Sequence, residues 1–376
     1  MNKVLVWGTG DAWSKIKSIL NLGVCDIVAF IDTFKKAEFN EGKKVIYPID
    51  IEQYDYDYLF IASSSNIDIN NKIKELKIRK DKIVDLWEVF LNIGYYNNMK
   101  EYLRRRLNKA KNLNIDTIIT GLSYARWGID ESILPNNILN LAMDSSDLYD
   151  NHLIAKRAIN LNKNIKNVII GLSYMSFEYD LSKVDVYTKY ACDIVYKDLI
   201  GDSRNILGNI VKDIRILEGN DAERLDLDIM KPESVGQLSL KNYPQNEVLR
   251  ICKNEALRDS NKNYPNTVKK NTIILKEYIE MLEQNNCNIT LVVFPVCRIY
   301  SKHFSERLKK QFKNIINEMK MNYNFRFLDY FDYQRMLNED FRDGSHLNKK
   351  GGRKFTHILN NDLFKVKLNG VISDEK

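Results

Sequence analysis

Short apolar segments alternate with helical segments along most of this chain, and this alternation restricts the folds available to it. Strands separated by helices pair in parallel through right-handed crossovers, so the pattern predicts an α/β protein. The expected strands are Lys3–Trp7, Asp26–Ile31, Leu59–Ala62, Thr117–Thr120, Ile138–Leu141, Asn167–Ile170, Thr290–Phe294 and Arg326–Leu328. The expected helices are Ala12–Leu22, Ile67–Leu76, Leu148–Asn160, Lys269–Gln284 and Phe304–Met319.

A length of 376 residues indicates two domains. We expect a Rossmann-like parallel sheet in residues 1–95, a charged helical connector in residues 96–112 and a second α/β/α domain in residues 113–370. Residues 184–268 are polar and rich in Asn and Asp, so they are predicted to be an insertion of helices and loops. Loops of this length are usually functional or disordered, and we interpret this one as a lid or substrate-facing cap.

The charge pattern argues against a nucleic-acid-binding protein. The net charge of +7 comes from 57 basic and 50 acidic residues that are spread along the chain. No strong basic stripe with interleaved aromatic residues appears, as nucleic-acid binding would require. The densest basic segment is Lys100–Lys111. We interpret it as a solvated helix face, with docking to an anionic membrane or a polyanionic glycan as the alternative.

The spacing of the cysteines and the hydropathy of the chain indicate the cellular compartment in which the protein is expected. The 5 cysteines are widely spaced and form no Cys-x-x-Cys pair, which fits a reducing compartment and favours neither a disulfide framework nor a zinc site. No other metal site is expected, because no His, Cys and carboxylate cluster has ligand spacing. No signal peptide and no apolar run of about 20 residues is visible. We therefore expect a cytoplasmic protein, with peripheral membrane association as an alternative.

The tetrapeptide Gly-Leu-Ser-Tyr occurs twice, at Gly121–Tyr124 and Gly171–Tyr174, each time directly after an expected strand. We expect two neighbouring strands that end in similar turns at the same sheet edge, although a duplication is an alternative. In an open parallel sheet the carboxyl edge is where ligands bind.

An Asp-x-x-His segment near the end of the chain suggests acid–base chemistry. Asp343 can hold the His346 imidazole by one nitrogen and leave the other free as a general base. The chain has only 4 histidines, so one in a polar turn stands out. The candidate nucleophile is Ser123, which lies in a Gly-x-Ser turn after the strand Thr117–Thr120.

With Ser123 first, Asp343 next and His346 last, residues 113 to about 365 resemble the SGNH (GDSL-like) hydrolases. They look most like the divergent branch that includes the D-alanyl transfer protein of teichoic acid synthesis and alginate O-acetyltransferase-type proteins. The resemblance implies a flavodoxin-like domain in which Ser123 is the nucleophile. His346 would be the general base and then the acid, and Asp343 would orient it.

The family's oxyanion blocks are altered in this chain. Ser145 lies nearest the place of the glycine in the second block, and Ser173 stands at the strand end where the third block has an Asn. The resemblance implies that the Ser145 backbone N–H and the Ser173 hydroxyl donate instead. Tyr124 and Arg126 follow the nucleophile and are expected either to bind an anionic substrate or to serve in packing or a salt bridge.

The amino-terminal segment carries Gly8-Thr9-Gly10, with Asp32 about twenty residues later. This is similar to a Rossmann dinucleotide fingerprint, except that Trp13 occupies the place of the third glycine. The region resembles nucleotide-sugar-related Rossmann domains attached to bacterial glycan-modifying enzymes. It implies a nucleotide or nucleotide sugar at Gly8, Gly10 and Asp32, with a scaffold or dimerisation module as the alternative.

These patterns predict a serine-dependent acyl-transfer enzyme, an O-acyltransferase or an esterase, that acts on a bacterial surface-glycan precursor. The triad itself requires no cofactor, and a cytosolic acyl donor such as an acyl-coenzyme A would serve transfer. The alternative is a non-catalytic nucleotide-sugar-binding or scaffold protein with a vestigial serine site. A nicotinamide-dependent oxidoreductase is a third alternative that Trp13 disfavours.

Overall fold

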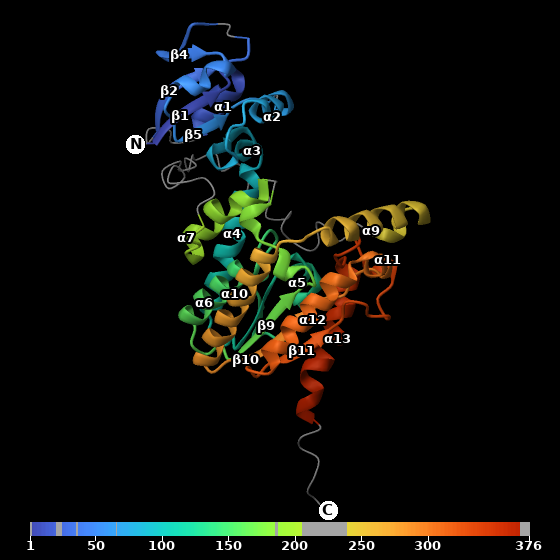
Figure 1. Ribbon diagram of the computed structural model, residues 1–376. Coiled ribbons are helices and arrows are strands. Elements are labelled where there is room, and N and C mark those ends of the chain that lie inside the picture. The colour runs from blue at the N-terminus through green and yellow to red at the C-terminus, as the bar shows by residue number, and fades with distance from the viewer. Residues whose placement is uncertain are drawn as a thin grey trace, which may run out of the picture. The chain divides into compact units, whose positions relative to one another are not determined.

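Two largely parallel sheets, each flanked by helices, give the protein its α/β architecture (Figure 1). The computed structural model describes residues 2–19, 25–34, 37–64, 66–184, 187–204 and 239–368. The chain divides into two compact units, and the first boundary between them follows Asn98, inside one helix. The α/β class predicted from the sequence is confirmed.

The sheet of the first unit has the strand order β3-β4-β2-β1-β5-β6. These strands are β1 (Asn2–Trp7), β2 (Cys25–Ile31), β3 (Phe39–Asn40), β4 (Lys43–Ile46), β5 (Tyr58–Ile61) and β6 (Ile83–Asp85). All of them pair in parallel except β3, which is antiparallel to β4. In chain order the five parallel strands run 3-2-1-4-5, which is the order of the first five strands of a Rossmann-type sheet.

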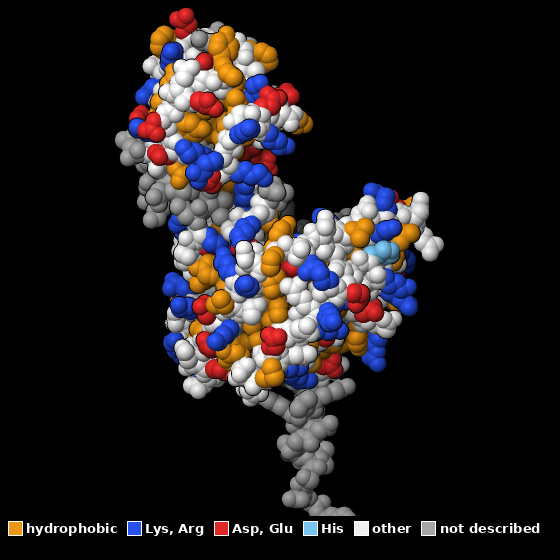
Figure 2. All heavy atoms as spheres, in the orientation of Figure 1, with side chains coloured by type: hydrophobic (Ala, Val, Ile, Leu, Met, Phe, Trp, Pro, Cys, Tyr) orange, Lys and Arg blue, Asp and Glu red, His pale blue; other side chains and the backbone are white. Residues whose placement is uncertain are grey.

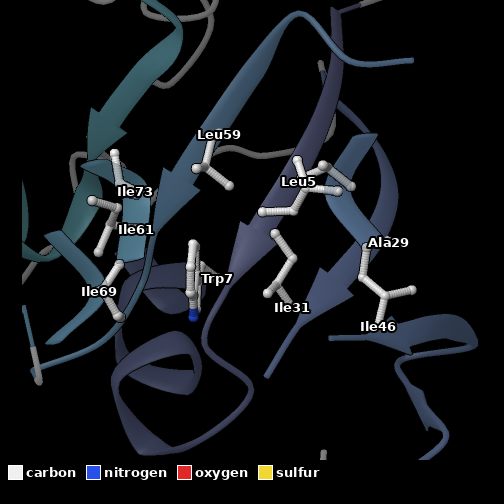
Figure 3. Close-up of a cluster of buried hydrophobic side chains, with 10 residues drawn as sticks. Leu5, Trp7, Ala29, Ile31, Ile46, Leu59, Ile61, Ile69 and Ile73 are labelled. Carbon is white, nitrogen blue, oxygen red and sulfur yellow. The ribbon is translucent and has the colours of Figure 1, made fainter. Parts of the chain in front are cut away.

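The core of this unit follows from the two-residue period of its strands. Alternate residues of β1, β2 and β5 point to one face of the sheet (Figure 3). The helix α2 (Asn66–Glu75) covers this face with Ile69 and Ile73, which are four residues apart. The core residues on this face are Leu5, Trp7, Ala29, Ile31, Leu59, Ile61, Ile69 and Ile73. On the other face, Trp13 from α1 (Asp11–Ile19) packs edge-on against Phe30.

Three short strands of the first unit were not predicted. The pair β3–β4 is a hairpin whose turn residues Glu41 and Gly42 both have positive φ, 49° and 77°. This is the conformation that two-residue hairpins favour. The strands β3 and β6 have only 2 and 3 residues, too few to show a period in the sequence.

The predicted domain limits differ from the observed ones. The predicted connector, residues 96–112, falls mostly within a longer helix, α4 (Ile93–Ala110), which follows α3 (Leu86–Leu91) after Asn92. Within the predicted insertion, residues 187–198 belong to the first unit, because Tyr96 Oη donates to the Tyr187 carbonyl at 2.8 Å. Another part of that insertion forms α9 (Gln245–Ser260) of the second unit, and residues 205–238 lie outside the described residues.

The sheet of the second unit has the strand order β11-β10-β9-β7-β8, and all of its pairs are parallel. Its strands are β7 (Thr117–Gly121), β8 (Ile138–Asn140), β9 (Asn167–Leu172), β10 (Asn288–Val293) and β11 (Arg326–Asp329). In chain order they run 2-1-3-4-5, the flavodoxin-like arrangement, and the order reverses between β7 and β9. Ligands of such sheets bind at this switch point, beyond the carboxyl ends of the strands.

Helices flank this sheet, and α6 packs against α10 while α13 packs against α5 (Figure 1). Besides the part of α4 from Met99 onward, the described residues of the second unit form α5 (Ser123–Gly128), α6 (Leu148–Leu161), α9, α10 (Pro265–Gln284), α11 (Arg298–His303), α12 (Glu306–Lys320) and α13 (Lys349–Leu368). A short helix, α7 (Lys197–Ile200), lies where the chain passes between the units.

Helix starts follow local chemistry, with Pro265 at the first position of α10 and the Ser305 side chain accepting from the Leu308 N–H before α12. Basic and acidic side chains intermingle on the face of the second unit shown in Figure 2. In the part of the chain that the structure describes, no helix has the length and apolar character needed to cross a bilayer.

Candidate active site

The turn after β7 places Ser123 at the start of a helix. Gly121 has a φ of +149°, and a Cβ there would lie 2.9 Å from the Gly171 Cα on the neighbouring strand. Only glycine fits this close approach of β7 to β9. Leu122 then caps α5, whose first residue is Ser123. The Ser123 side chain therefore sits at the carboxyl edge of the sheet, beside the switch point.

The Asp-x-x-His segment closes into a small turn. Phe341 and Leu347 form an isolated antiparallel bridge, and the Arg342 N–H donates to the His346 carbonyl at 3.0 Å. Inside this turn, Asp343 Oδ1 accepts the N–H groups of Ser345 at 3.0 Å and His346 at 2.7 Å. These bonds fix the carboxylate beneath the imidazole, as the sequence predicted for this spacing.

The structure brings the three predicted triad residues together. Ser123 Oγ lies 2.8 Å from His346 Nε2. His346 Nδ1 lies 3.0 and 3.1 Å from the two carboxylate oxygens of Asp343. This is the hydrogen-bonded order that nucleophilic serine catalysis requires: hydroxyl, then imidazole, then carboxylate.

Electrostatics in the turn favour a protonated imidazole next to a charged carboxylate. Burial lowers the pKa of His346, but the charge and hydrogen bond of Asp343 outweigh this, so the pKa lies above the ordinary 6.5. Burial likewise raises the pKa of Asp343, but the charges of His346 and Arg342 hold it well below the ordinary 3.8. Asp343 therefore stays ionised at neutral pH and stabilises the imidazolium that forms when His346 takes a proton.

The two serines predicted as oxyanion donors lie on loops next to the nucleophile turn. Ser145 has a φ of +45°, a left-handed conformation that normally favours glycine. The loop is tied to the nucleophile turn, because the Met143 N–H donates to the Gly121 carbonyl at 3.1 Å.

Ser173 follows β9 at the position equivalent to Ser123 after β7, because Gly171 pairs with Gly121 in register. This agrees with the prediction that the two Gly-Leu-Ser-Tyr turns lie on neighbouring strands. Ser173 is buried, and its Oγ has no hydrogen-bond partner among the described residues. Its N–H donates to Ser176 Oγ at 2.9 Å.

Tyr124 and Arg126 are interior residues, and the packing alternative describes them. The Tyr124 ring packs against the His346 imidazole with centroids 5.1 Å apart. Arg126 is 3% exposed, and its Nε lies 3.2 Å from Asp144 Oδ2. The Arg126 guanidinium also lies over the Tyr102 ring at 4.0 Å. The expectation that these two residues bind an anionic substrate is not supported by this placement.

A residue that sequence reasoning missed is Glu255, on α9. Its Oε2 accepts the Gly344 N–H at 2.8 Å, and its Oε1 accepts the Ser345 hydroxyl. Both donors lie between Asp343 and His346. The sequence carried one weak signal: Val248, Cys252 and Ala256 recur four residues apart and turn one face of α9 inward.

One group of side chains in the described residues has ligand atoms close enough to hold a metal ion. The ligand atoms of Glu255, Asp343 and His346 lie within 4.8 Å of one another. Each already has a hydrogen-bond partner in the protein: His346 Nδ1 faces Asp343, and Glu255 accepts from Gly344 and Ser345. The arrangement of these three side chains therefore fits a hydrogen-bonded acid–base site.

The predicted nucleotide-binding residues of the first unit meet at the carboxyl end of β1. Gly8 has a φ of +125°, and a Cβ there would overlap the Ala62 carbonyl oxygen. A Cβ at Gly10 would meet no described heavy atom within 4 Å. Asp32 Oδ2 accepts the Thr9 hydroxyl at 2.8 Å and Asp32 Oδ1 accepts the Phe34 N–H at 2.8 Å. Asp32 thus stabilises the turn formed by Gly8, Thr9 and Gly10 through its hydrogen bond with Thr9.

Comparisons with known proteins cover the two parts of the chain unequally. Residues 1–84 match a family model described as C2185-like, N-terminal. No curated protein matches the chain. A solved structure from Streptococcus pneumonia, of a protein proposed to be a platelet activating factor, is similar at 13% identity and a TM-score of 0.36. The similarity covers 75% of this chain and 100% of that chain, and at this level it carries no argument about function.

Proposed function

We propose that the protein is a serine-dependent acyl-transfer enzyme, an O-acyltransferase or an ester hydrolase. The observation that carries the proposal is the continuous hydrogen-bond path from Ser123 through His346 to Asp343, with 2.8 Å and 3.0 Å steps. A serine hydroxyl is a weak nucleophile unless an adjacent base accepts its proton, and this path supplies that base. Its position beside the switch point of a flavodoxin-like sheet also supports a substrate site.

The reaction proceeds in two halves. Ser123 Oγ attacks the acyl carbonyl while His346 Nε2 takes the hydroxyl proton, and His346 then gives that proton to the leaving group. A water molecule or a sugar hydroxyl next attacks the acyl-enzyme carbonyl while His346 Nε2 accepts its proton. The bond between the acyl carbon and Ser123 Oγ then breaks, and His346 returns the proton to Ser123. Asp343 holds the imidazole in the required orientation and stays ionised throughout.

The carbonyl oxygen becomes negatively charged during each half-reaction and needs hydrogen-bond donors. The N–H of Ser123 at the start of α5, the N–H of Ser145 and the hydroxyl of Ser173 are the proposed donors. The buried Ser173 hydroxyl, which has no partner among the described residues, supports this assignment, since buried polar groups are normally paired.

The substrate class rests on the sequence resemblance. We infer a bacterial surface-glycan precursor as acceptor and favour transfer over hydrolysis, because the two oxyanion blocks of the hydrolases are altered at Ser145 and Ser173. An acyl-coenzyme A is the proposed donor if the reaction occurs in the cytoplasm. Mass spectrometry of the surface glycan from a deletion strain tests this, and an unchanged acylation pattern contradicts it.

A second function is favoured by the first unit. The glycine turn after β1 stands at the point where the strand order of a Rossmann-type sheet reverses, which is where nucleotides bind. In this alternative, the chain is a nucleotide-sugar-binding or scaffold protein of glycan synthesis with an inert serine. Calorimetric titration with uridine and guanosine diphosphate sugars distinguishes the two: tight binding by a protein with an unreactive Ser123 favours this alternative.

A further inference from the structure

Glu255 reaches the candidate triad from a helix about ninety residues earlier in the chain. Its two carboxylate oxygens each accept one donor, the Gly344 N–H at 2.8 Å and the Ser345 hydroxyl. An ionised carboxylate accepts at both oxygens, whereas a protonated one must use an oxygen as a donor. The two bonds hold the Glu255 carboxylate against the turn between Asp343 and His346. Burial and the charge of Asp343 raise the pKa of Glu255 above the ordinary 4.5, and the side chain is negatively charged above that raised pKa.

The turn is shaped to receive this side chain. A Cβ on Gly344 would lie 2.7 Å from Glu255 Oε2 and 3.2 Å from the Cys252 Cα on the same helix. The other side of the turn is held by α11, because the Cys297 N–H that precedes this helix donates to the Gly344 carbonyl at 2.9 Å. The turn is thus fixed between α9 and α11.

Ser345 links Glu255 to the triad. Its hydroxyl donates to Glu255 Oε1 and lies 3.1 Å from His346 Nδ1 and 3.5 Å from Asp343 Oδ1. Moving the Glu255 carboxylate would free the hydroxyl and the Gly344 N–H together. Both are next to the residues whose spacing sets the imidazole orientation.

Charged groups around His346 come from three elements. The turn itself supplies the charged Asp343 and Arg342, α9 supplies Glu255, and α5 supplies the Tyr124 phenol, which burial keeps neutral. Arg258, also on α9, lies 3.9 Å from Glu255 and is largely exposed. The negative charge of Glu255 adds to that of Asp343 in raising the pKa of His346.

We propose that Glu255 is a positioning residue, a second carboxylate that holds the Asp343–His346 turn in its productive shape through Gly344 and Ser345. This inference rests on the proposed function of the triad, but its geometry concerns the turn alone. The role of α9 is then to hold the turn that carries His346. Side chains that orient metal-binding histidines by hydrogen bonds typically contribute about 10–100-fold to activity, and we expect an effect of this size from Glu255.

The test measures the titration of His346 directly and needs no substrate. The chain has 4 histidines, so NMR of protein labelled with 13C-histidine resolves them, and the His346 signal is identified by its loss in His346→Ala. In Glu255→Gln the titration midpoint of His346 should move to lower pH. The matched control is Glu247→Gln on the same helix, whose carboxylate pairs with Arg250 and should leave the midpoint unchanged. An unchanged midpoint in folded Glu255→Gln would overturn the inference.

A second variant tests the inference if Glu255→Gln does not fold. Ser345→Ala removes only the bridging hydroxyl, and its rate of labelling by a fluorophosphonate probe at alkaline pH should fall about tenfold or more. A wild-type rate in Ser345→Ala would also overturn the inference. Absence of labelling in the wild type would count against the proposed enzyme, while the histidine titration still decides the role of Glu255.

Discussion

Gly121 and Gly171 pair across β7 and β9 so closely that a Cβ on Gly121 would lie 2.9 Å from both the Cα and the carbonyl oxygen of Gly171. Each glycine is followed two residues later by a serine, Ser123 after β7 and Ser173 after β9. The close strand contact thus brings two serine-bearing turns to one sheet edge, at the point where the strand order reverses.

The first prediction concerns that contact. Gly121→Ala should lower the free energy of unfolding by about 1–3 kcal/mol, because the side chain clashes and the φ of +149° is unfavourable for alanine. Urea denaturation measures the loss. Gly94→Ala is the control, since its Cβ meets no described heavy atom within 4 Å and alanine favours a helix. Equal stability of Gly121→Ala and wild type would contradict the account of the turn.

The second prediction is the pH dependence of serine reactivity. His346 must be neutral to accept the Ser123 proton, and Asp343 raises the pKa of His346 above the ordinary 6.5. The labelling rate should therefore rise with pH, with a midpoint above 6.5. Stability changes in the opposite direction. The contribution of the raised His346 pKa is fully present below 6.5 and is lost as pH rises through the folded pKa, while that of Asp343 is present above 3.8 and is lost as pH falls through its lowered folded pKa. A midpoint below 6.5 for the labelling rate disagrees with this electrostatic argument.

The third prediction concerns the carboxylate of the triad. Asp343→Asn should reduce the labelling rate by about 10⁴, because an amide no longer stabilises the imidazolium and favours the wrong tautomer of His346. Single-exponential labelling kinetics measure the rate. Asp55→Asn is the control, since Asp55 lies in the first unit and forms an exposed ion pair with Lys3. A reduction smaller than tenfold in Asp343→Asn would remove Asp343 from the triad.

The fourth prediction separates structural from substrate-binding roles of Arg126. Its buried pairing with Asp144 means that Arg126→Met should lower the free energy of unfolding by about 3 kcal/mol. Arg105→Met removes an exposed guanidinium and leaves its partner Glu101 paired with Arg104, so it should cost less than about 1 kcal/mol. Thermal and urea unfolding measure both variants. A stable Arg126→Met protein with a raised KM would restore the substrate-binding interpretation.

Much of the fold could be predicted because each element carries a local signal. The apolar runs of β1, β7, β9 and β10 and the helical periods between them indicated a parallel α/β arrangement. The short strands β3 and β6 lack a period, and the division of residues 184–268 between the two units depends on tertiary contacts such as that of Tyr96 with Tyr187. Sequence spacing does not contain such contacts.

The candidate site shows the same limit. Asp343 and His346 are three residues apart, so their hydrogen bond follows from local geometry, and Ser123 was recognised by its strand-turn context. Glu255 lies 89 residues from Gly344, in a polar segment without a motif. Its role emerges only when α9 packs against α11 and brings its inward face to the turn.

The most direct test of the central claim is covalent labelling of Ser123 by a fluorophosphonate probe. We expect the wild type to be labelled at Ser123, as mapped by peptide mass spectrometry, and Ser123→Ala and His346→Ala to lose the label. His357→Ala, at an exposed histidine on α13, should be labelled like the wild type. A folded wild-type protein that remains unlabelled, or label that persists in Ser123→Ala, would contradict the assignment of Ser123 as an activated nucleophile.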